Sequence, residues 1–418
     1  MNVVLAKCSP MAAKAASKNL FTWDDLDLDS LAIASHKRPH PKTHSGKIGE
    51  VLSVLKATKP AFKRPKSTSF TFIDLFAGIG GFRLAGNKVK GDCVFTSEWD
   101  KYARRAYFLN YGEVPFGDIT NFTRDDAGLR NIPKHDVLCG GFPCQAFSIS
   151  GKQAGFKDPR GTLFFEVYKI AKHHKPKVLF LENVKNFARH DNGKTFETVK
   201  HYLEVKMREE TKGACSYRVS SAVLNASDFG ATTKRERIYI VAVREDIAKR
   251  SDWSEWKETF VRLNKVVGAK TRPLQVSLQE NSEIEPWLLN KVMIKRNDFK
   301  LKKDFSSEIT PKPVRVGILG KGGQGERIYS TQGHAITFSA YGGGAASKTG
   351  AYLIEGKVRK LTPKECANCM GFSGINMDLE AVPLVQRYKQ FGNSVVVNVV
   401  EAIFGEIARR WLSKPVRG

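Results

Sequence analysis

The feature that most constrains the fold is an alternation of short apolar runs with helical stretches, which extends from Ser69 to Arg244. The apolar runs predict strands at 70–76, 93–97, 136–139, 178–181, 219–224 and 238–243. The stretches between them predict helices, among them 101–111, 162–174 and 195–210. Strands that alternate with helices indicate an α/β domain built on a mostly parallel sheet with right-handed crossovers.

The rest of the chain divides around this α/β domain, which we assign to residues 69–248. Residues 1–68 predict a basic N-terminal extension that is disordered, with a stretch at 23–34 compatible with a short helix; the alternative is a small DNA-binding or regulatory module. Residues 249–358 lose the alternation and carry Gly-rich segments, which predicts a second, smaller and irregular domain. Helical periodicity returns in 359–418, so we expect this part to rejoin the first domain.

Composition restricts the partners. The formal net charge is +26, and an excess of Lys and Arg that large favours nucleic acid, whose phosphates attract these side chains. An anionic membrane surface is the alternative, but no basic amphipathic helix dominates, and no run reaches the roughly 18 apolar residues of a membrane span. The seven cysteines are dispersed and lack paired zinc-ligand spacing, so we expect no metal and a reducing compartment. No secretory signal is predicted in 1–18.

A glycine-rich turn, Phe76–Gly81, follows the first predicted strand and precedes a helix. Glycines there let the backbone approach a nucleotide-like ligand closely, and Glu98, at the end of the next strand, is placed to bind ribose hydroxyls. Trp99 beside it can lie against an adenine. The pattern fits NAD, FAD and S-adenosylmethionine alike, but the full dinucleotide fingerprint is missing, which favours S-adenosylmethionine.

Three further motifs follow strand ends, where open α/β sheets bind ligands. The first, 140–148, contains Cys144, which is either a nucleophile in a loop or a structural thiol, with a disulfide to Cys139 as a further alternative. The second begins with Glu182, either a carboxylate in the same crevice or a helix cap. The third contains Arg235 and Arg237, either a solvated charged turn or donors to a substrate acceptor.

Together these side chains suit one reaction. Carbon 5 of cytosine becomes nucleophilic when a thiolate adds to carbon 6, and a carboxyl group at ring nitrogen 3 and an arginine at the exocyclic oxygen stabilise the developing charge. A base stacked in a duplex cannot react in this way, so it must be flipped out.

An ordered series of motifs resembles the bacterial DNA cytosine-5 methyltransferases, most closely the HhaI-type members, from about residue 69 to the C-terminus. The motifs are FIDLFAGIGGFRLA, SEWD, GDIT, GGFPCQAFSISG, DPRGTLFFE, ENV, KRERIYIVAVR, RKLTPKECANCMGF and QFGNSVVVNV. The resemblance implies a Rossmann-like S-adenosylmethionine-dependent methyltransferase domain with a smaller target-recognition domain. One departure is Thr233 with Lys234, where the family usually has Gln.

The resemblance also implies residue roles. Cys144 matches the nucleophile, Glu182 the carboxylate at ring nitrogen 3, and Arg237 with Arg235 the arginine pair. Positions that line the S-adenosylmethionine pocket are matched by Phe76, Ala77, Gly78, Ile79, Gly81, Glu98, Trp99, Asp118, Ile119, Pro143, Leu163, Asn393 and Val395.

For DNA recognition, GILGKGGQGERIYSTQG and ITFSAYGGG are similar to the HhaI-type segments, which recognise GCGC. By that likeness Gln324 fills the gap left by the flipped cytosine and Arg327 reads a guanine edge. Thr337 and Tyr341 lie on the backbone or near bases, and Ser150 belongs to a loop that closes over the DNA. We therefore expect a monomer on double-stranded DNA, a cytoplasmic bacterial enzyme, and a cognate restriction endonuclease as a candidate partner.

Three other functions share parts of this pattern. An RNA-directed relative would share the fold and donor, but the Gly-rich recognition segment argues against it. A DNA-binding protein that has lost catalysis is disfavoured because Cys144, Glu182 and Arg237 are all present. A nicotinamide-dependent oxidoreductase is suggested by the glycine turn alone.

Replacing the predicted nucleophile separates chemistry from binding. Cys144→Ala is expected to abolish methyl transfer, because no thiolate is left to attack carbon 6, while DNA binding is retained. Transfer of a labelled methyl group and a DNA gel-shift assay measure the two properties. Loss of DNA binding in a folded variant would instead assign this residue to folding or recognition.

Overall fold

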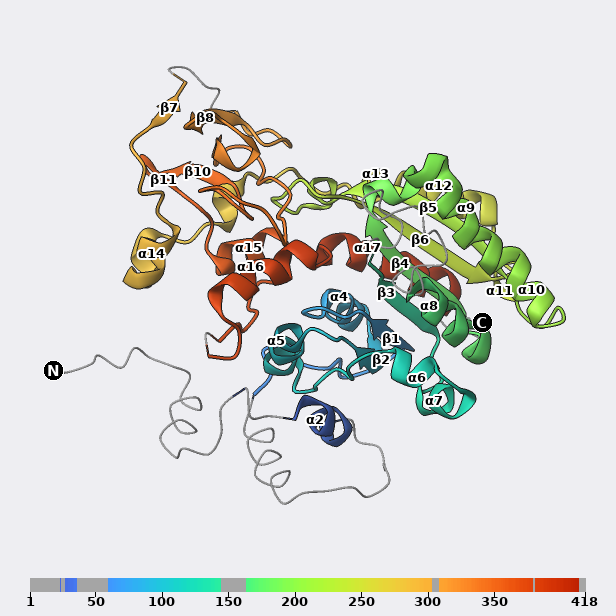
Figure 1. The fold of residues 1–418 in the computed structure, drawn as a ribbon. Helices are drawn as coiled ribbons and strands as arrows, with labels where there is room; N and C mark the ends of the chain where they lie inside the picture. Colours follow the sequence, from blue (N-terminus) through green and yellow to red (C-terminus); the bar gives the residue numbers. More distant parts are fainter. Residues whose placement is uncertain are drawn as a thin grey trace.

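The computed structural model describes residue 23 and residues 27–35, 59–143, 163–302, 308–378 and 380–412. Its largest element is a six-stranded sheet with the strand order β2-β1-β3-β4-β6-β5, covered by helices on both faces (Figure 1). The strands are β1 (Phe70–Leu75), β2 (Gly91–Ser97), β3 (Val137–Gly141), β4 (Val178–Val184), β5 (Tyr217–Asn225) and β6 (Glu236–Arg244). In this sheet β6 runs antiparallel to β4 and to β5, and the other pairs of neighbouring strands are parallel. All the predicted strands and the mostly parallel sheet are confirmed.

The two faces of the sheet are both buried, which explains why β3 and β4 read as continuous apolar runs. Successive side chains of a strand point to opposite faces, so Phe72 and Ile73 of β1 belong to different cores. On the face of Phe72 pack α4 (Gly81–Lys88), α5 (Lys101–Tyr111) and α17 (Val397–Ile407), with Phe404 against Phe72 at 5.4 Å between ring centroids. On the other face lie α6 (Thr120–Thr123), α7 (Asp126–Asn131), α8 (Leu163–His174), α9 (Lys194–His201) and α10 (Met207–Glu210).

The direction of strand progression reverses between β1 and β3, because β2 lies on one side of β1 and β3 with β4 on the other. At such a switch point the connections leave in opposite directions and open a crevice outside the carboxyl ends of the strands. The glycine-rich turn follows β1, and the loop that continues to Cys144 follows β3. The glycine-rich turn and the described start of the second motif, residues 140–143, therefore lie at the crevice.

A second, smaller sheet has the order β11-β10-β9-β8-β7. Its strands are β7 (Phe299–Leu301), β8 (Arg315–Leu319), β9 (Arg327–Ser330), β10 (Ala351–Ile354) and β11 (Lys357–Arg359), with α14 (Pro286–Val292) beside them. Val316, Leu319 and Ile328 lie in its own apolar core. The expectation of an irregular second domain is thus corrected, because short paired strands organise it.

The boundary between the two domains also differs from the expected one after residue 248. Two helices beyond it, α12 (Trp253–Val261) and α13 (Leu263–Val267), pack on the large sheet. Trp256 on α12 donates to Ser220 Oγ on β5 at 2.8 Å. Its ring also packs edge-to-face against Trp411, with 4.9 Å between the ring centroids. The large domain therefore continues through α11 (Glu245–Ala248) and α12 to α13.

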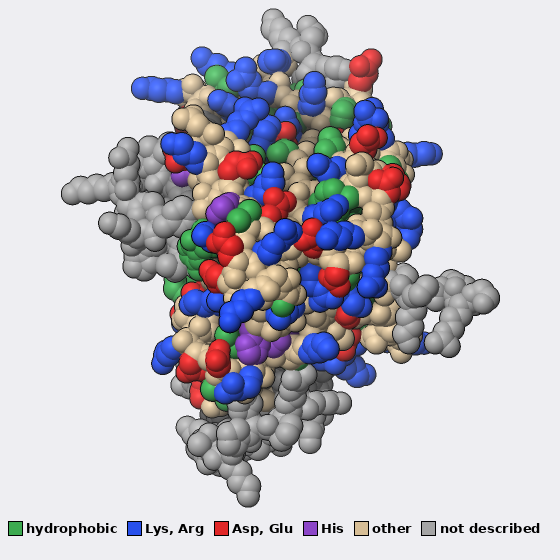
Figure 2. Space-filling model, turned by 90° about the vertical axis from the view of Figure 1, so that its right-hand side faces the viewer, with side chains coloured by type: hydrophobic (Ala, Val, Ile, Leu, Met, Phe, Trp, Pro, Cys, Tyr) green, Lys and Arg blue, Asp and Glu red, His purple; other side chains and the backbone are tan. Residues whose placement is uncertain are grey.

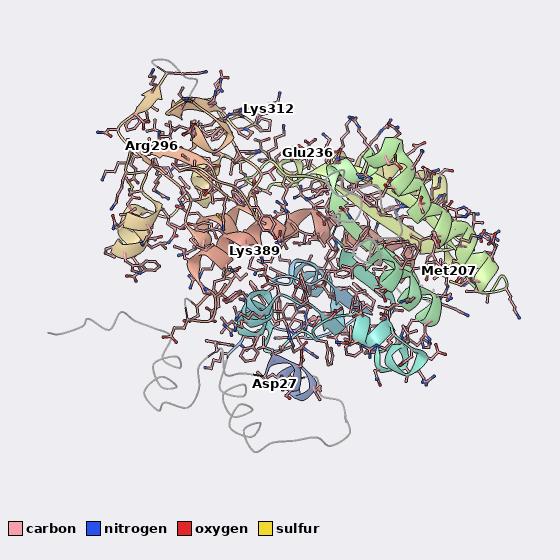
Figure 3. All side chains as sticks on the ribbon, in the orientation of Figure 1. Asp27, Met207, Glu236, Arg296, Lys312 and Lys389 are labelled. Carbon is pink, nitrogen blue, oxygen red and sulfur yellow. The ribbon has the colours of Figure 1, made fainter. Side chains whose placement is uncertain are left out.

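The C-terminal part packs on the large domain through α15 (Pro363–Cys369), α16 (Leu384–Asn393), α17 and a π-helical turn at Ala408–Leu412. In Figure 3, Lys389 of α16 lies between the small domain and the lower part of the large one. The stretch Leu384–Leu412 is long and apolar enough to cross a membrane by those two criteria alone. However, extended backbone at Ser394 and Val396 interrupts it, and 56% of its most apolar window is buried inside the protein, as in a core helix.

Part of the N-terminal extension is ordered, which corrects the expectation of disorder for that part. Helix α2 (Leu28–Ser35) packs on the large domain beside α5 (Figure 1). Apart from residue 23 and residues 27–35, the stretch 1–58 lies outside the described residues. Basic side chains are spread over the face seen in Figure 2, with acidic side chains among them, so the excess charge is not confined to one stripe of that face.

A buried ion pair joins the small sheet to the C-terminal return. Arg359 of β11 donates twice to Glu365 of α15, at 2.8 Å each, and Glu365 also closes a capping box with Thr362. Glu365→Ala is expected to lower the free energy of unfolding by about 3–5 kcal/mol, because it leaves a buried guanidinium unpaired. Glu401→Ala, which breaks the exposed pair with Lys88, should cost about 0–1 kcal/mol. Urea unfolding of both variants tests this, and equal losses would contradict it.

Candidate active site

The glycine-rich turn adopts a backbone that few residues tolerate. Phe76, Gly78 and Gly80 have positive φ angles of 57°, 55° and 82°. A Cβ on Gly80 would lie 2.4 Å from the ring of Tyr111, whose hydroxyl donates to Gly80 O at 2.8 Å. Glycine is therefore required at that position, and Phe76 is a strained non-glycine residue at the end of β1, as is common at functional sites.

Glu98 connects this turn to the end of β2. Its carboxylate accepts from Gly78 N and from Asp100 N, both at 2.8 Å. Burial raises the pKa of Glu98, and the amide donors oppose that shift. Trp99 next to it is 82% exposed, and a Cβ on Gly78 would meet nothing within 4 Å. The turn thus offers open space beside a fixed carboxylate and a free indole.

The C-terminal return closes against the same turn. A Cβ on Gly81 would lie 2.4 Å from Val395 Cγ2, so the absence of a side chain allows this contact. Lys389 of α16 donates to Asp100 Oδ2 at 2.8 Å. Asn393 is exposed at the end of α16. The structure therefore brings Val395 to the glycine turn, with Asn393 two residues before it.

The remaining predicted cofactor positions lie on neighbouring connections. Ser97 Oγ donates to Gly117 O at 2.7 Å, which fixes the segment that carries buried Ile119 and exposed Asp118 beside the end of β2. Pro143 is exposed after β3, and half-buried Leu163 begins α8.

A carboxylate and an arginine meet where β4 pairs with β6. Glu182 Oε1 lies 3.1 Å from Arg237 Nε, and both side chains are mostly buried. Burial raises the pKa of Glu182 even though Arg237 opposes the shift. A Cβ on Gly141 would lie 3.1 Å from Glu182 Oε2, so this glycine lets the carboxylate sit over the end of β3. A carboxyl group that retains its proton more readily than usual, beside an arginine, can donate to a ring nitrogen.

Arg235 has different partners from those expected of a substrate-binding arginine. It donates to Phe338 O at 3.1 Å, and to Gly392 O and Ser394 O at 2.8 Å each. Burial lowers its pKa to about 9. The side chain thus joins the start of β6 to the small domain and to the C-terminal return, and Arg237 is the arginine that pairs with the carboxylate.

Asn183 is a residue to which the sequence analysis gave no role. Its side chain donates to Phe142 O at 3.0 Å and accepts from Val184 N at 2.8 Å. It therefore ties the end of β4 to Phe142, which precedes Cys144 by two residues in the sequence. The sequence signal for this role was an amide side chain directly after a carboxylate at the end of a predicted strand.

The small domain contacts the segment before β6 through a short stretch of paired backbone. Thr233 bridges Ala335, and Thr337 donates to Lys234 O at 2.5 Å. Glu236, labelled in Figure 3, lies where the two domains meet. Tyr341 is exposed, and Arg327 begins β9.

Some residues that the sequence predicts to be functional lie outside the described part of the structure. Cys144 and Ser150 fall within 144–162, and the side chain of Gln324 is likewise not described. Across the ranges that the structure does describe, no cluster of three or more His, Cys, Asp or Glu side chains is suited to a metal ion.

Comparisons with known proteins agree with one another. The profile of the C-5 cytosine-specific DNA methylases matches residues 70–409. The type II methyltransferase M.HhaI of Haemophilus parahaemolyticus is 48% identical over 84% of this chain and 98% of its own length, and M.HpaII of Haemophilus parainfluenzae is 39% identical over 80% and 87%. The crystal structure of the S. pombe Dnmt2 methyltransferase superposes with a TM-score of 0.60, at 18% identity, over 81% of this chain and 98% of that one.

Asp74, just before the glycine turn, is expected to make the stability of the folded protein depend on pH. This fully buried carboxyl has its pKa raised by burial from 3.8 to about 8. The folded state therefore keeps a proton that the unfolded state has lost, so the free energy of unfolding should fall as pH rises from about 4 to about 8, by at most about 1.4 kcal/mol per pH unit.

Asp74→Asn should remove this part of the pH dependence and leave the slope from other groups. Urea midpoints of the two proteins, measured across that pH range, test the expectation. Parallel curves would show that Asp74 is ionised in the folded protein.

Proposed function

The chain belongs to the family of C-5 cytosine-specific DNA methylases, and on that premise we propose its donor, mechanism and target. It transfers a methyl group from S-adenosylmethionine to carbon 5 of a flipped-out cytosine in duplex DNA, through a covalent bond between Cys144 and carbon 6. The observation that carries this proposal is the Glu182–Arg237 pair, in which Glu182 on β4 lies opposite Gly141 of β3, three residues before Cys144 in the sequence.

The glycine turn fits the donor. Open space beside Gly78, the fixed carboxylate of Glu98 and the exposed face of Trp99 suit a backbone contact, a ribose and an adenine respectively. Ile119, Pro143, Leu163, Asn393 and Val395 complete the proposed pocket. The sulfonium of the bound donor supplies an electrophilic methyl group.

The protein's own groups prepare the cytosine. The Cys144 thiolate adds to carbon 6, while Glu182 holds a proton at ring nitrogen 3, so the electron pair of the carbon 5–carbon 6 double bond becomes available at carbon 5. Arg237 keeps Glu182 oriented and donates to the exocyclic oxygen as charge develops there. After carbon 5 gains the methyl group it loses its proton, and the returning electron pair expels the Cys144 thiolate.

We assign the target GCGC to the small domain because its recognition segments are similar to those of the HhaI-type members. Arg327 reads a guanine edge, Gln324 fills the space of the flipped base, and Thr337 and Tyr341 contact backbone or bases. Ser150 closes with its loop over the DNA. A monomer on DNA, a cytoplasmic location and a cognate restriction endonuclease remain predictions.

The direct test is transfer of labelled methyl from S-adenosylmethionine to two duplexes, one with GCGC and one with those bases scrambled. Label on carbon 5 of the inner cytosine, in the first duplex only, is the expected result. Label in neither duplex, with folded protein, would reject the target, and random-sequence DNA and transfer RNA would then separate a different site from an RNA substrate.

A substitution of Arg327 tests whether this residue recognises a guanine of the target. Arg327→Ala should lose about 1–3 kcal/mol of discrimination between GCGC and a site with the contacted guanine replaced. Arg315→Ala, a matched change at an exposed residue of the neighbouring strand β8, should leave that ratio unchanged. The ratio of kcat/KM values on the two duplexes measures the effect. An unchanged ratio in Arg327→Ala would show that Arg327 does not contribute to recognition of the target bases.

A further inference from the structure

The ordered part of the N-terminal extension lies outside the family match at 70–409, yet it is built into the large domain. Helix α2 buries Leu28, Leu31 and Ala32 against Phe108 of α5 and against Val114, which follows α5. An apolar face covered in this way is an intramolecular docking contact, not a free surface.

A buried arginine adds a polar link to this contact. Arg104 of α5 donates to Leu28 O at 2.8 Å and to Asp29 Oδ1 at 2.7 Å. The same guanidinium group donates through Nε to Pro115 O at 2.9 Å. One side chain therefore fixes α2 and the segment after α5 to each other.

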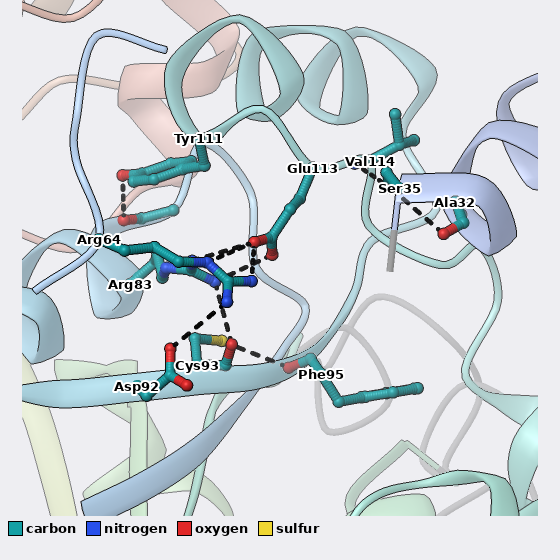
Figure 4. A network of polar contacts seen from close by, with 11 residues as sticks. Ala32, Ser35, Arg64, Arg83, Asp92, Cys93, Phe95, Tyr111, Glu113 and Val114 are labelled. Atoms are coloured by element: carbon teal, nitrogen blue, oxygen red, sulfur yellow. Dashed lines mark hydrogen bonds and ion pairs between the residues drawn. The ribbon is translucent and has the colours of Figure 1, made fainter. Parts of the chain in front are cut away.

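A second link lies next to the first. Arg64, in the stretch that leads into β1, pairs with Glu113, which also accepts from Arg83 of α4 at 3.2 Å (Figure 4). Val114 N donates to Ser35 Oγ at 3.1 Å. Residues of the extension thus hold 113–114 from two sides.

The segment held in this way leads directly into the donor site. Glu98 N donates to Phe116 O at 2.8 Å, and Ser97 Oγ donates to Gly117 O. A Cβ on Gly117 would lie 3.1 Å from Asp29 Oδ1, so the carboxylate of α2 lies against the residue that precedes Asp118. The extension therefore contacts the backbone that positions Glu98 on one side and Ile119 on the other.

We propose that residues 27–35, together with 59–66, form a strap that holds segment 113–119 against β2 and thereby sets the affinity for S-adenosylmethionine. The proposal rests on the proposed donor. A ligand that binds only the ordered arrangement shows an apparent dissociation constant that rises as the ordered fraction falls. The named strap contacts involve neither Cys144 nor Glu182, so the chemistry itself stays intact.

Two variants of the full chain release the strap by different means. Leu31→Asp places a charge in the apolar contact, and Ala32→Trp overfills it, since both residues are buried. Ile33→Asp is the matched control, because Ile33 lies on the same helix and is 40% exposed. Amide hydrogen exchange of 113–119 measures ordering of the segment, and calorimetry measures S-adenosylmethionine binding.

Both release variants should show faster exchange in 113–119 and an affinity for S-adenosylmethionine about fivefold or more weaker, whereas the control resembles the unaltered protein. With saturating donor and DNA, kcat should stay within about twofold. Faster exchange with unchanged affinity would overturn the proposal, as would unchanged exchange in both variants. If the unaltered protein binds no S-adenosylmethionine, the donor assignment fails and the affinity claim falls with it, while the exchange data still decide whether the strap orders the segment.

Discussion

The site depends on three distant parts of the chain meeting at one edge of the sheet, and the buried guanidinium of Arg235 joins them. Its acceptors, Phe338, Gly392 and Ser394, are 103 to 159 residues away along the chain. Arginine suits this position because its planar group carries several donors in fixed directions. The desolvation that lowers its pKa is offset by three carbonyl contacts, so the C-terminal return and the small domain are both fixed relative to β6.

The two neighbouring arginines, Arg235 and Arg237, therefore have different partners. Because both terminal nitrogens of Arg235 donate to carbonyls, Arg237 is the one that pairs with Glu182. The return held by Arg235 also carries Val395, which packs on Gly81 of the turn. The same contact thus supports the edge with the Glu182–Arg237 pair and the edge with the glycine turn, which explains why a helix from the end of the chain belongs to the first domain.

The sequence predicted the large sheet because buried strands leave short but continuous apolar runs, and it predicted Glu98, Glu182 and Arg237 because polar residues at strand ends share one crevice. It did not predict the small sheet, whose strands are three to five residues long and separated by glycine-rich loops without an alternating pattern. Nor did it predict the roles of Arg235 and Asn183, since backbone carbonyls accept hydrogen bonds whatever the side chain. The stretch 23–34 was compatible with a short helix, but the docking of α2 on the large domain was not predicted, because its partners, Arg104 and Phe108, are remote in sequence.

The central claim is that Cys144 forms a bond to carbon 6 of a cytosine in GCGC before the methyl group is transferred. A duplex with 5-fluorocytosine at the inner position tests it, because a fluorine at carbon 5 leaves no proton to be lost and the thiolate cannot be expelled. Mass spectrometry of the digested complex should show the nucleotide, with one added methyl group, on the peptide that contains Cys144, only when S-adenosylmethionine is present. Methylation of the ordinary duplex without any such adduct, or an adduct on another residue, would contradict the account.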